Sequence, residues 1–123
     1  MSGRPILVIE DNEQNLYLVR FLLEKNGYEV VEARDGQTGL ELAKRLVPAA
    51  IILDIQLPVM TGYAVATALR EHDALARVPI IAVTSFAMVG DRERCLEAGA
   101  TDYLEKPIDP SAFLAKLREH LGA

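Results

Sequence analysis

Short apolar runs alternate along the chain with longer stretches in which apolar residues recur every three or four positions. The runs are rich in β-branched residues, as strands buried on both faces are. They lie at 6–9, 28–33, 49–53, 79–83 and 103–104. Each run is followed by a segment with helical periodicity. The pattern therefore predicts a strand–helix unit that is repeated five times.

Turn and capping residues set the expected boundaries of the helices. Asn12 is a suitable N-cap for the first helix, which should end at Asn26-Gly27, and Pro48 ends the second. Asp109 followed by Pro110 is a favoured way to begin the last helix. The helical residues expected to face the core are Leu16, Val19, Leu22, Leu23, Leu40, Ala43, Leu46 or Val47, Val65, Leu69, Phe113, Leu114, Leu117 and Leu121.

Buried strands that alternate with helices are typical of a parallel sheet covered on both sides. We therefore predict an α/β fold, a doubly wound (βα)5 sheet of five strands. Right-handed crossovers place every strand-to-helix loop at the same edge of such a sheet. Ligands of these folds bind outside the carboxyl ends of the strands, where the strand order reverses. The functional residues are expected at that edge.

Composition narrows the function classes. The chain has 123 residues, which suits one domain over 1–123, and a net charge of −5 with a pI near 5.0. That charge argues against nucleic acid as a partner, and no apolar run is long enough to cross a membrane. Cys95 is the only cysteine, which excludes an internal disulfide. With no signal peptide evident, a cytoplasmic location is expected. His72 and His120 are expected to be solvated surface residues.

Polar residues stand where four of the predicted strands end. Glu10 and Asp11 follow the first strand, Asp54 the third, Thr84 the fourth and Lys106 the fifth. Carboxylates that lie close together repel one another unless a cation sits among them. Oxygen ligands of this kind suit Mg²⁺. Asp54 could then act as a nucleophile toward a phosphoryl group, with charge neutralised by the metal and by Lys106.

Each of these residues also has an ordinary explanation. Acids at the start of a helix often serve only as caps, Thr84 alone suits a strand end, and Lys106 alone suits a solvated surface. Taken singly, the ordinary explanation is the better one. The coincidence of an acid pair, a lone aspartate, a hydroxyl and a lysine at four strand ends favours a site.

The same stretches resemble the receiver domains of two-component signalling, the CheY-like family, over 6–121. The matching motifs are Val8-Ile9-Glu10-Asp11-Asn12, Leu53-Asp54-Ile55-Gln56-Leu57-Pro58 with Gly62, Ala82-Val83-Thr84, and Tyr103-Leu104-Glu105-Lys106-Pro107. The wording of the motifs is similar to that of DivK-like single-domain response regulators. The resemblance implies a flavodoxin-like strand order of 2-1-3-4-5 and a single receiver domain without an output domain.

The resemblance also implies a metal site for Mg²⁺ or Mn²⁺. In this reading Asp11 ligates the ion directly and Glu10 acts through a metal-bound water. Asp54 and the main-chain carbonyl of Gln56 complete the protein contacts. Glu10 stands where the family more often has Asp, and we expect this change to tune the site rather than abolish metal binding.

For signalling, the resemblance implies that Asp54 accepts a phosphoryl group from a phosphohistidine. Lys106 would pair with that group, Thr84 would swing to hydrogen-bond it, and Tyr103 would change rotamer as Thr84 moves. The bond between Lys106 and Pro107 is expected to be cis. Gln56 and Phe86 lie two residues beyond Asp54 and Thr84 and would tune dephosphorylation, with the apolar Phe86 hindering the attacking water.

The leading interpretation is a signalling switch rather than a turnover enzyme. The donor would be a histidine kinase or a histidine phosphotransfer protein. The output would be binding to a downstream protein, or homodimerisation, through the fourth helix, fifth strand and fifth helix.

Three alternatives remain. A phosphatase of the haloacid dehalogenase type needs a second acid where Gln56 stands. An FMN carrier of flavodoxin type needs a phosphate loop where Glu10 and Asp11 stand. A receiver that acts only as a scaffold would lack phosphorylation, although all the required side chains are present.

Overall fold

The computed structural model describes residues 4–85 and 90–121. The strands are β1 (Ile6–Ile9), β2 (Val30–Ala33), β3 (Ala50–Asp54), β4 (Ile80–Thr84) and β5 (Asp102–Glu105). The helices are α1 (Glu13–Lys25), α2 (Gly36–Leu46), α3 (Gly62–Arg70), α4 (Asp91–Ala98) and α5 (Pro110–Leu121), with a short 3-10 helix, η1 (Asp73–Leu75).

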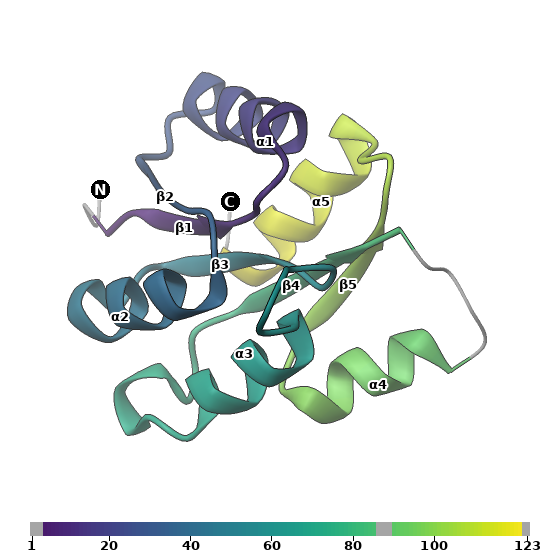
Figure 1. The fold of residues 1–123 in the computed structure, drawn as a ribbon. Coiled ribbons are helices and arrows are strands. Elements are labelled where there is room, and N and C mark those ends of the chain that lie inside the picture. Colours follow the sequence, from purple (N-terminus) through teal and green to yellow (C-terminus); the bar gives the residue numbers. More distant parts are fainter. Residues whose placement is uncertain (1–3, 86–89, 122–123) are drawn as a thin grey trace.

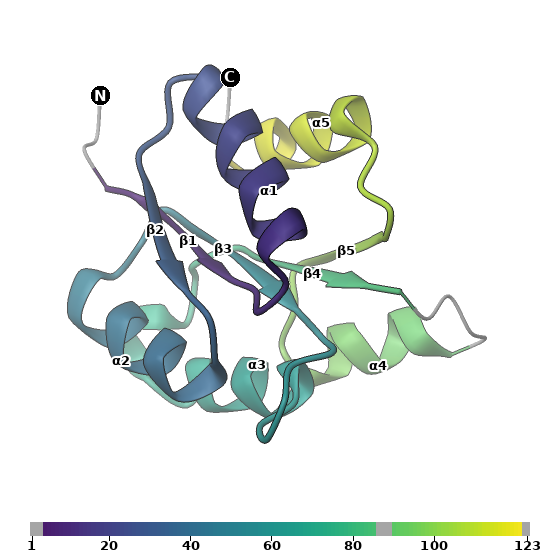
Figure 2. The ribbon, with the colours of Figure 1, turned by 45° about the horizontal axis from the view of Figure 1, so that its top comes forward.

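The five strands form one parallel sheet in the order β2-β1-β3-β4-β5. Helices α1 and α5 cover one face, and α2, α3 and α4 cover the other (Figures 1 and 2). The predicted α/β architecture and strand order are confirmed. Since β1 lies between β2 and β3, the strand order reverses there, and the carboxyl ends of β1 and β3 border the position where ligands bind in such sheets.

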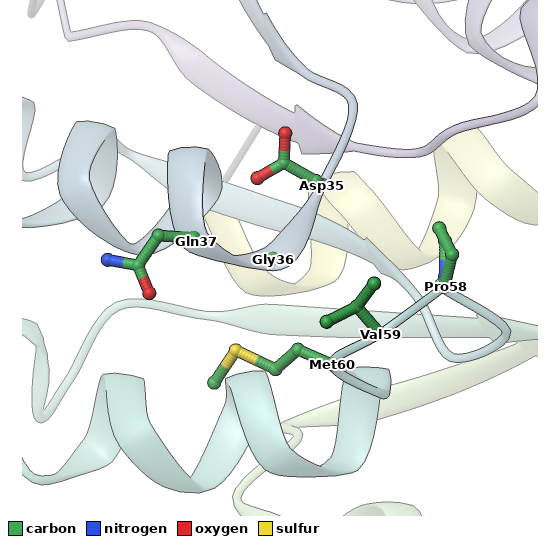
Figure 3. Close-up of a pocket in the computed structure, with 6 residues that line it drawn as sticks. All are labelled: Asp35, Gly36, Gln37, Pro58, Val59 and Met60. Atoms are coloured by element: carbon green, nitrogen blue, oxygen red, sulfur yellow. The ribbon is translucent and has the colours of Figure 1, made fainter.

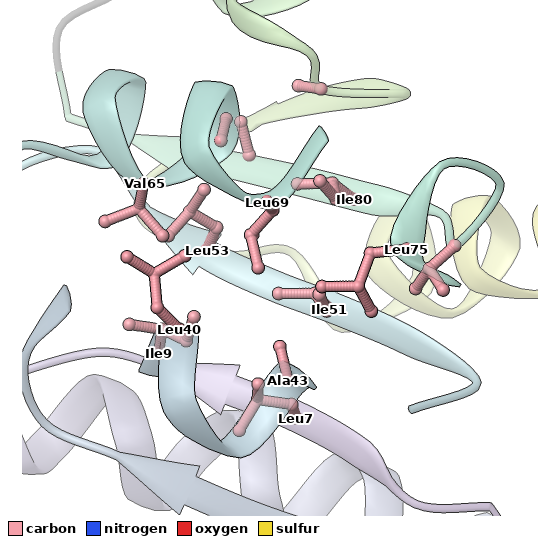
Figure 4. Packing of buried hydrophobic residues seen from close by; sticks show 14 of the residues in the cluster. Leu7, Ile9, Leu40, Ala43, Ile51, Leu53, Val65, Leu69, Leu75 and Ile80 are labelled. Carbon is pink, nitrogen blue, oxygen red and sulfur yellow. The ribbon is translucent and has the colours of Figure 1, made fainter. Parts of the chain in front are cut away.

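Alternate residues of the central strands enter two separate cores. From β1, Leu7 and Ile9 pack beneath α2 and α3, whereas Ile6 and Val8 pack beneath α1 and α5. Figure 4 shows the first cluster, in which side chains of β1 and β3 meet those of α2 and α3. Because both faces are covered, all four residues of β1 are fully buried. This explains why the strands read as continuous apolar runs.

Capping side chains fix the start of the helices. The side chain of Asn12 accepts a hydrogen bond from the Asn15 amide at 3.0 Å, and that of Asp109 accepts one from the Ala112 amide at 3.0 Å. Both predicted caps are confirmed. Thr61 caps α3 in the same manner, with its hydroxyl accepting from the Ala64 amide.

Some predicted boundaries were wrong by a few residues. Strand β2 begins at Val30 rather than Tyr28, because the Tyr28 amide donates to the Leu23 carbonyl at 3.0 Å and so closes the end of α1. Of the residues expected to face the core from α5, Phe113 and Leu117 are fully buried, whereas Leu114 and Leu121 are half-buried. Among the described residues, no helix is both long and apolar enough to span a bilayer.

Candidate functional site

The predicted polar residues converge at the carboxyl ends of the strands. Asp54 is the last residue of β3 and lies opposite Val83 of β4. Glu10 directly follows β1, and Thr84 ends β4. All three are buried, with exposed fractions of 3%, 3% and 0% for Asp54, Glu10 and Thr84 respectively. Buried polar residues gathered at one edge of the sheet mark it as the candidate site.

Lys106 brings a cation to these acids. Its ammonium donates to Asp54 Oδ1 at 3.0 Å and lies 3.4 Å from Glu10 Oε1. The lysine side chain is only 13% exposed, so the pair is shielded from solvent far more than a surface ion pair is. Lys106 follows β5, and its amide donates to the Thr84 carbonyl at 2.8 Å. The backbone of β4 therefore positions the residue that carries the ammonium.

Three carboxylates lie close enough to share one ion. Glu10, Asp11 and Asp54 each offer an oxygen, and these atoms all lie within 4.8 Å of one another. Asp11 is exposed, whereas the other two are buried. Three carboxylate oxygens, two from buried residues and one from an exposed residue, are ligands that suit a hard cation such as Mg²⁺. The residues present therefore fit the predicted ion.

Crowding changes the acidity of Glu10. Burial, a hydrogen bond with Asp54 and the charge of Asp54 together raise the pKa of Glu10 to about 7. The Asn12 amide and the Lys106 ammonium act in the opposite direction, with smaller effects. The positive charge of Lys106 alone therefore does not offset the effects of burial and of Asp54 on the pKa of Glu10. Glu10 retains a proton at a pH where an ordinary glutamate has lost it.

Gln56 connects the loop after β3 to the end of β4. Its amide nitrogen in the main chain donates to Asp54 Oδ1 at 3.1 Å. Its side chain donates from Nε2 to the Thr84 hydroxyl at 2.5 Å and accepts from the Ser85 amide through Oε1 at 3.0 Å. Sequence reasoning placed Gln56 at the site, but for its carbonyl and for water access; the side-chain contacts with Thr84 and Ser85 were missed.

The remaining predicted residues fall into place unevenly. The Lys106-Pro107 bond is cis, as expected. Tyr103 is half-buried on β5 and pairs in register with Ala82; burial, and then the charges of Asp91 and Glu105, raise its pKa. Phe86 lies outside the described residues.

Gly62 holds the loop after β3 tightly against the site. Its amide donates to the Ile55 carbonyl at 3.0 Å. A Cβ at this position would lie 2.5 Å from both the Asp54 carbonyl oxygen and Ile55 Cα. Any larger residue would push the loop away from the end of β3. The glycine in the predicted motif therefore serves the backbone geometry around Asp54.

Two contacts elsewhere were not foreseen. The Tyr63 hydroxyl of α3 donates to Asp91 at the start of α4. His120 was expected to be solvated, and this was wrong: its Nε2 lies 2.9 Å from Asp102 Oδ2, and its side chain is 19% exposed. Asp102 also accepts from Lys116. Both pairs join residues far apart in the sequence, which gives no local pattern to recognise.

A shallow pocket lies beside the site but does not contain it. It has a volume of about 300 Å³. Its lining comes from the start of α2 and the loop before α3: Asp35, Gly36, Gln37, Pro58, Val59 and Met60 (Figure 3). None of these residues belongs to the acid cluster. The candidate site is therefore the acid cluster at the strand ends and not this pocket.

Comparison with known proteins agrees with this geometry. The family model of the response regulator receiver domain matches residues 6–118. The chain belongs to this family, whose members are response regulator receiver domains of two-component signalling.

The chain is 41% identical over 119 residues to the polar-differentiation response regulator DivK of Brucella anthropi, covering 97% of each protein. DivK of Brucella ovis is 40% identical over the same share. The predicted similarity to DivK-like regulators is thus confirmed.

Solved structures show the same fold. The receiver domain of the sensor histidine kinase PA1611 from Pseudomonas aeruginosa PAO1 superposes with a TM-score of 0.90 and 38% identity, over 99% of this chain and 100% of that one. That structure has a magnesium ion coordinated in its active site cleft. The chemotaxis protein CheY4 of Vibrio cholerae gives a TM-score of 0.90 at 30% identity, over 96% of this chain and 98% of that one.

Proposed function

We propose that this protein is a phosphorylation-controlled switch that receives a phosphoryl group on Asp54 from a phosphohistidine of a histidine kinase or a phosphotransfer protein. The observation that carries the proposal is the convergence on Asp54 of an ammonium at 3.0 Å and of two further carboxylates within 4.8 Å. A nucleophilic carboxylate needs positive charge nearby when its target is a phosphoryl group. The cluster supplies the carboxylate, that of Asp54, and the positive charge, that of the Lys106 ammonium.

Residues of this cluster would hold Mg²⁺ or Mn²⁺. Asp11 and Asp54 would be direct ligands, Glu10 would act through a bound water, and the main-chain carbonyl of Gln56 would add a further contact. When bound, the ion supplies positive charge that lets the carboxylates stay ionised together and neutralises phosphoryl oxygens. The magnesium ion in the cleft of the PA1611 receiver domain supports this assignment.

In the transfer, an oxygen of Asp54 attacks phosphorus and the bond between phosphorus and the histidine nitrogen breaks. The nitrogen keeps the bonding pair, and the imidazole returns to its neutral form by taking a proton from solvent. Lys106 pairs with the phosphoryl oxygens as they approach. No group of the cluster needs to act as a strong base, because a carboxylate nucleophile, unlike a hydroxyl, has no proton to lose when it attacks.

The phosphorylated protein then alters a binding surface. Thr84 moves to donate to the phosphoryl group, and Tyr103 follows. This biases a face formed by α4, β5 and α5 toward a downstream protein partner or a second copy of the chain. The chemistry is limited to the protein's own phosphorylation and dephosphorylation, and Gln56 and Phe86 govern the access of the hydrolytic water.

Acetyl phosphate tests this proposal without a cognate kinase. Incubation with acetyl phosphate and Mg²⁺ should add the mass of one phosphoryl group to the intact protein. Asp54→Asn should show no gain. Sustained turnover of small phosphate esters would instead favour the phosphatase, and a bound yellow chromophore would favour the FMN carrier. No mass gain in the wild type would leave only the scaffold.

A further inference from the structure

The side chain of Gln56 forms two hydrogen bonds across the mouth of the site. Nε2 donates to the Thr84 hydroxyl at 2.5 Å, and Oε1 accepts from the Ser85 main-chain amide at 3.0 Å. Thr84 is the last residue of β4, and Ser85 begins the loop that leads to α4. One side chain of the β3–α3 loop therefore holds both the hydroxyl and the first peptide of the β4–α4 loop.

The chemistry of the partners fixes the orientation of this amide. A main-chain N–H only donates, so the atom that faces Ser85 must be the oxygen of Gln56. The amide nitrogen then faces Thr84, and the threonine oxygen is the acceptor in that contact. The two bonds support each other, since turning the amide over would place its NH₂ group against the Ser85 N–H.

We propose that the Gln56 amide is a positioning group that holds Thr84 and the Ser85 peptide in the resting arrangement, and that it must release them before the Thr84 hydroxyl reaches a phosphoryl group on Asp54. The inference rests on the proposed function, because it concerns the regulation of the same site. It gives the Gln56 side chain a task distinct from metal contact through its carbonyl and from the path of water.

Competition follows from the number of groups available. Ser85 has one N–H, which Gln56 Oε1 occupies, and Thr84 is fully buried at the position where Gln56 holds it. Main-chain and hydroxyl donors at a strand end are the groups that a phosphoryl oxygen seeks. The phosphoryl group and Gln56 Oε1 therefore compete for the Ser85 N–H, while the bond from Gln56 Nε2 holds the Thr84 oxygen in its resting place. In both ways Gln56 biases the protein toward its unphosphorylated arrangement.

A phosphoryl mimic measures this competition. The affinity for beryllofluoride in the presence of Mg²⁺ should be about 3- to 10-fold higher in Gln56→Ala than in the wild type, which corresponds to one or two net hydrogen bonds that need not be broken. Gln56→Met, which retains the length of the side chain without its polar atoms, should shift affinity in the same direction. Gln37→Ala, at an exposed glutamine whose side chain donates to Glu41, should bind as the wild type does. Unchanged or weaker binding by both Gln56 variants would overturn the proposal.

A second measurement needs no ligand. In buffer with a chelator, a double-mutant cycle between Gln56→Ala and Thr84→Val should show a coupling of about 3- to 10-fold in the unfolding equilibrium constant. Additive effects would mean that the Gln56 side chain does not hold Thr84 in solution, which would also overturn the proposal. The cycle could show coupling while neither the wild type nor the variants bind beryllofluoride. In that case Gln56 does hold Thr84, but the proposed function fails, and with it the proposed competition between Gln56 and a phosphoryl group.

Discussion

Two partly buried cations, Arg70 and Lys106, lie at opposite ends of the sheet and have different partners. Arg70 ends α3, and its guanidinium donates to carbonyl oxygens of the main chain and to the Thr101 hydroxyl. The carbonyls are those of Gly99 at 2.8 Å, Leu75 at 2.8 Å, Ala76 at 3.3 Å and Val78 at 2.7 Å. Lys106 instead contacts the carboxylates of Asp54 and Glu10.

The difference in partners separates a structural charge from the charge at the proposed site. The groups around Arg70 are uncharged acceptors, so they leave no excess negative charge that a second cation could neutralise. Around Lys106 the partners are two carboxylates that repel each other. Burial, a hydrogen bond with Asp54 and the charge of Asp54 together raise the pKa of Glu10 to about 7. A second cation would relieve that repulsion. Burial alone therefore does not mark a functional cation; the charge of its partners does.

Removing the structural cation should have the largest effect on stability. Arg70→Ala leaves several main-chain carbonyls without their donor, and we expect the free energy of unfolding to fall by about 4 kcal/mol. Chemical denaturation measures the loss. Arg77→Ala, an exposed arginine just beyond η1, serves as the control and should change the free energy little. If the two variants were equally stable, Arg70 would not support the junction of α3, α4 and β4.

The raised pKa of Glu10, which lies beside Lys106, should appear in the pH dependence of stability. The folded protein holds the Glu10 proton up to about pH 7, whereas the unfolded chain releases it near the ordinary value of 4.5. Between these values the folded state binds more protons, so stability should rise as pH falls from 8 to 5. The expected gain in the metal-free protein is on the order of 3 kcal/mol.

Other shifted carboxyl groups do not obscure that window. Asp35 has a lowered pKa because it accepts hydrogen bonds from Thr38. Burial of Asp102 raises its pKa, but hydrogen bonds from His120 and Lys116 outweigh that effect and leave the pKa lowered. Both groups act below about pH 4. Thermal denaturation at several pH values should therefore show the gain in the wild type and not in Glu10→Gln. An equal gain in that variant would contradict the raised pKa.

Lys106 and a metal ion should compete for the same acids. Lys106→Met removes a positive charge close to the predicted ion, so Mg²⁺ affinity should increase by roughly tenfold. Calorimetric titration measures the affinity. Lys116→Met removes an ammonium bound to Asp102 instead, and it should leave Mg²⁺ affinity unchanged. Weaker binding in Lys106→Met would show that the lysine supports the metal site rather than opposing it.

The hydrogen bond that joins α3 to α4 should make a smaller, purely structural contribution to stability. Asp91 accepts from the Tyr63 hydroxyl, and its Oδ2 is buried without a hydrogen-bond partner among the described residues. The Arg94 guanidinium lies 4.0 Å from the Tyr63 ring centre. Tyr63→Phe should lower the free energy of unfolding by about 1 kcal/mol. Tyr17→Phe, at an exposed tyrosine, should have no measurable effect, and a similar result for both would remove the contact's role.

The sequence allowed the sheet and most of the acid cluster to be predicted because both depend on local patterns. Apolar runs recur wherever a strand is covered on both faces, and Glu10, Asp54 and Lys106 each follow such a run. Arg70 left no comparable pattern. Its partners are main-chain carbonyls, which every residue type possesses, so no residue identity reveals them.

Side-chain contacts between elements were the other part that could not be predicted. The contacts of the Gln56 side chain with Thr84 and Ser85 depend on how far the β3–α3 loop reaches toward β4. This distance is set by the tight packing of Gly62 against Ile55. The contact of His120 with Asp102 depends likewise on the angle at which α5 crosses β5. Periodicity defines which face of an element is buried, but not which polar atoms meet at its ends.

The central claim is that an acid cluster with a bound cation allows Asp54 to carry a phosphoryl group. Borohydride reduction after treatment with acetyl phosphate tests it most directly, because an aspartyl phosphate is reduced to homoserine, which peptide mass spectrometry locates. We predict homoserine at position 54 in the presence of Mg²⁺ and none when a chelator replaces the metal. Homoserine at Asp11 or another acid, no modification, or the same yield without metal would contradict the account.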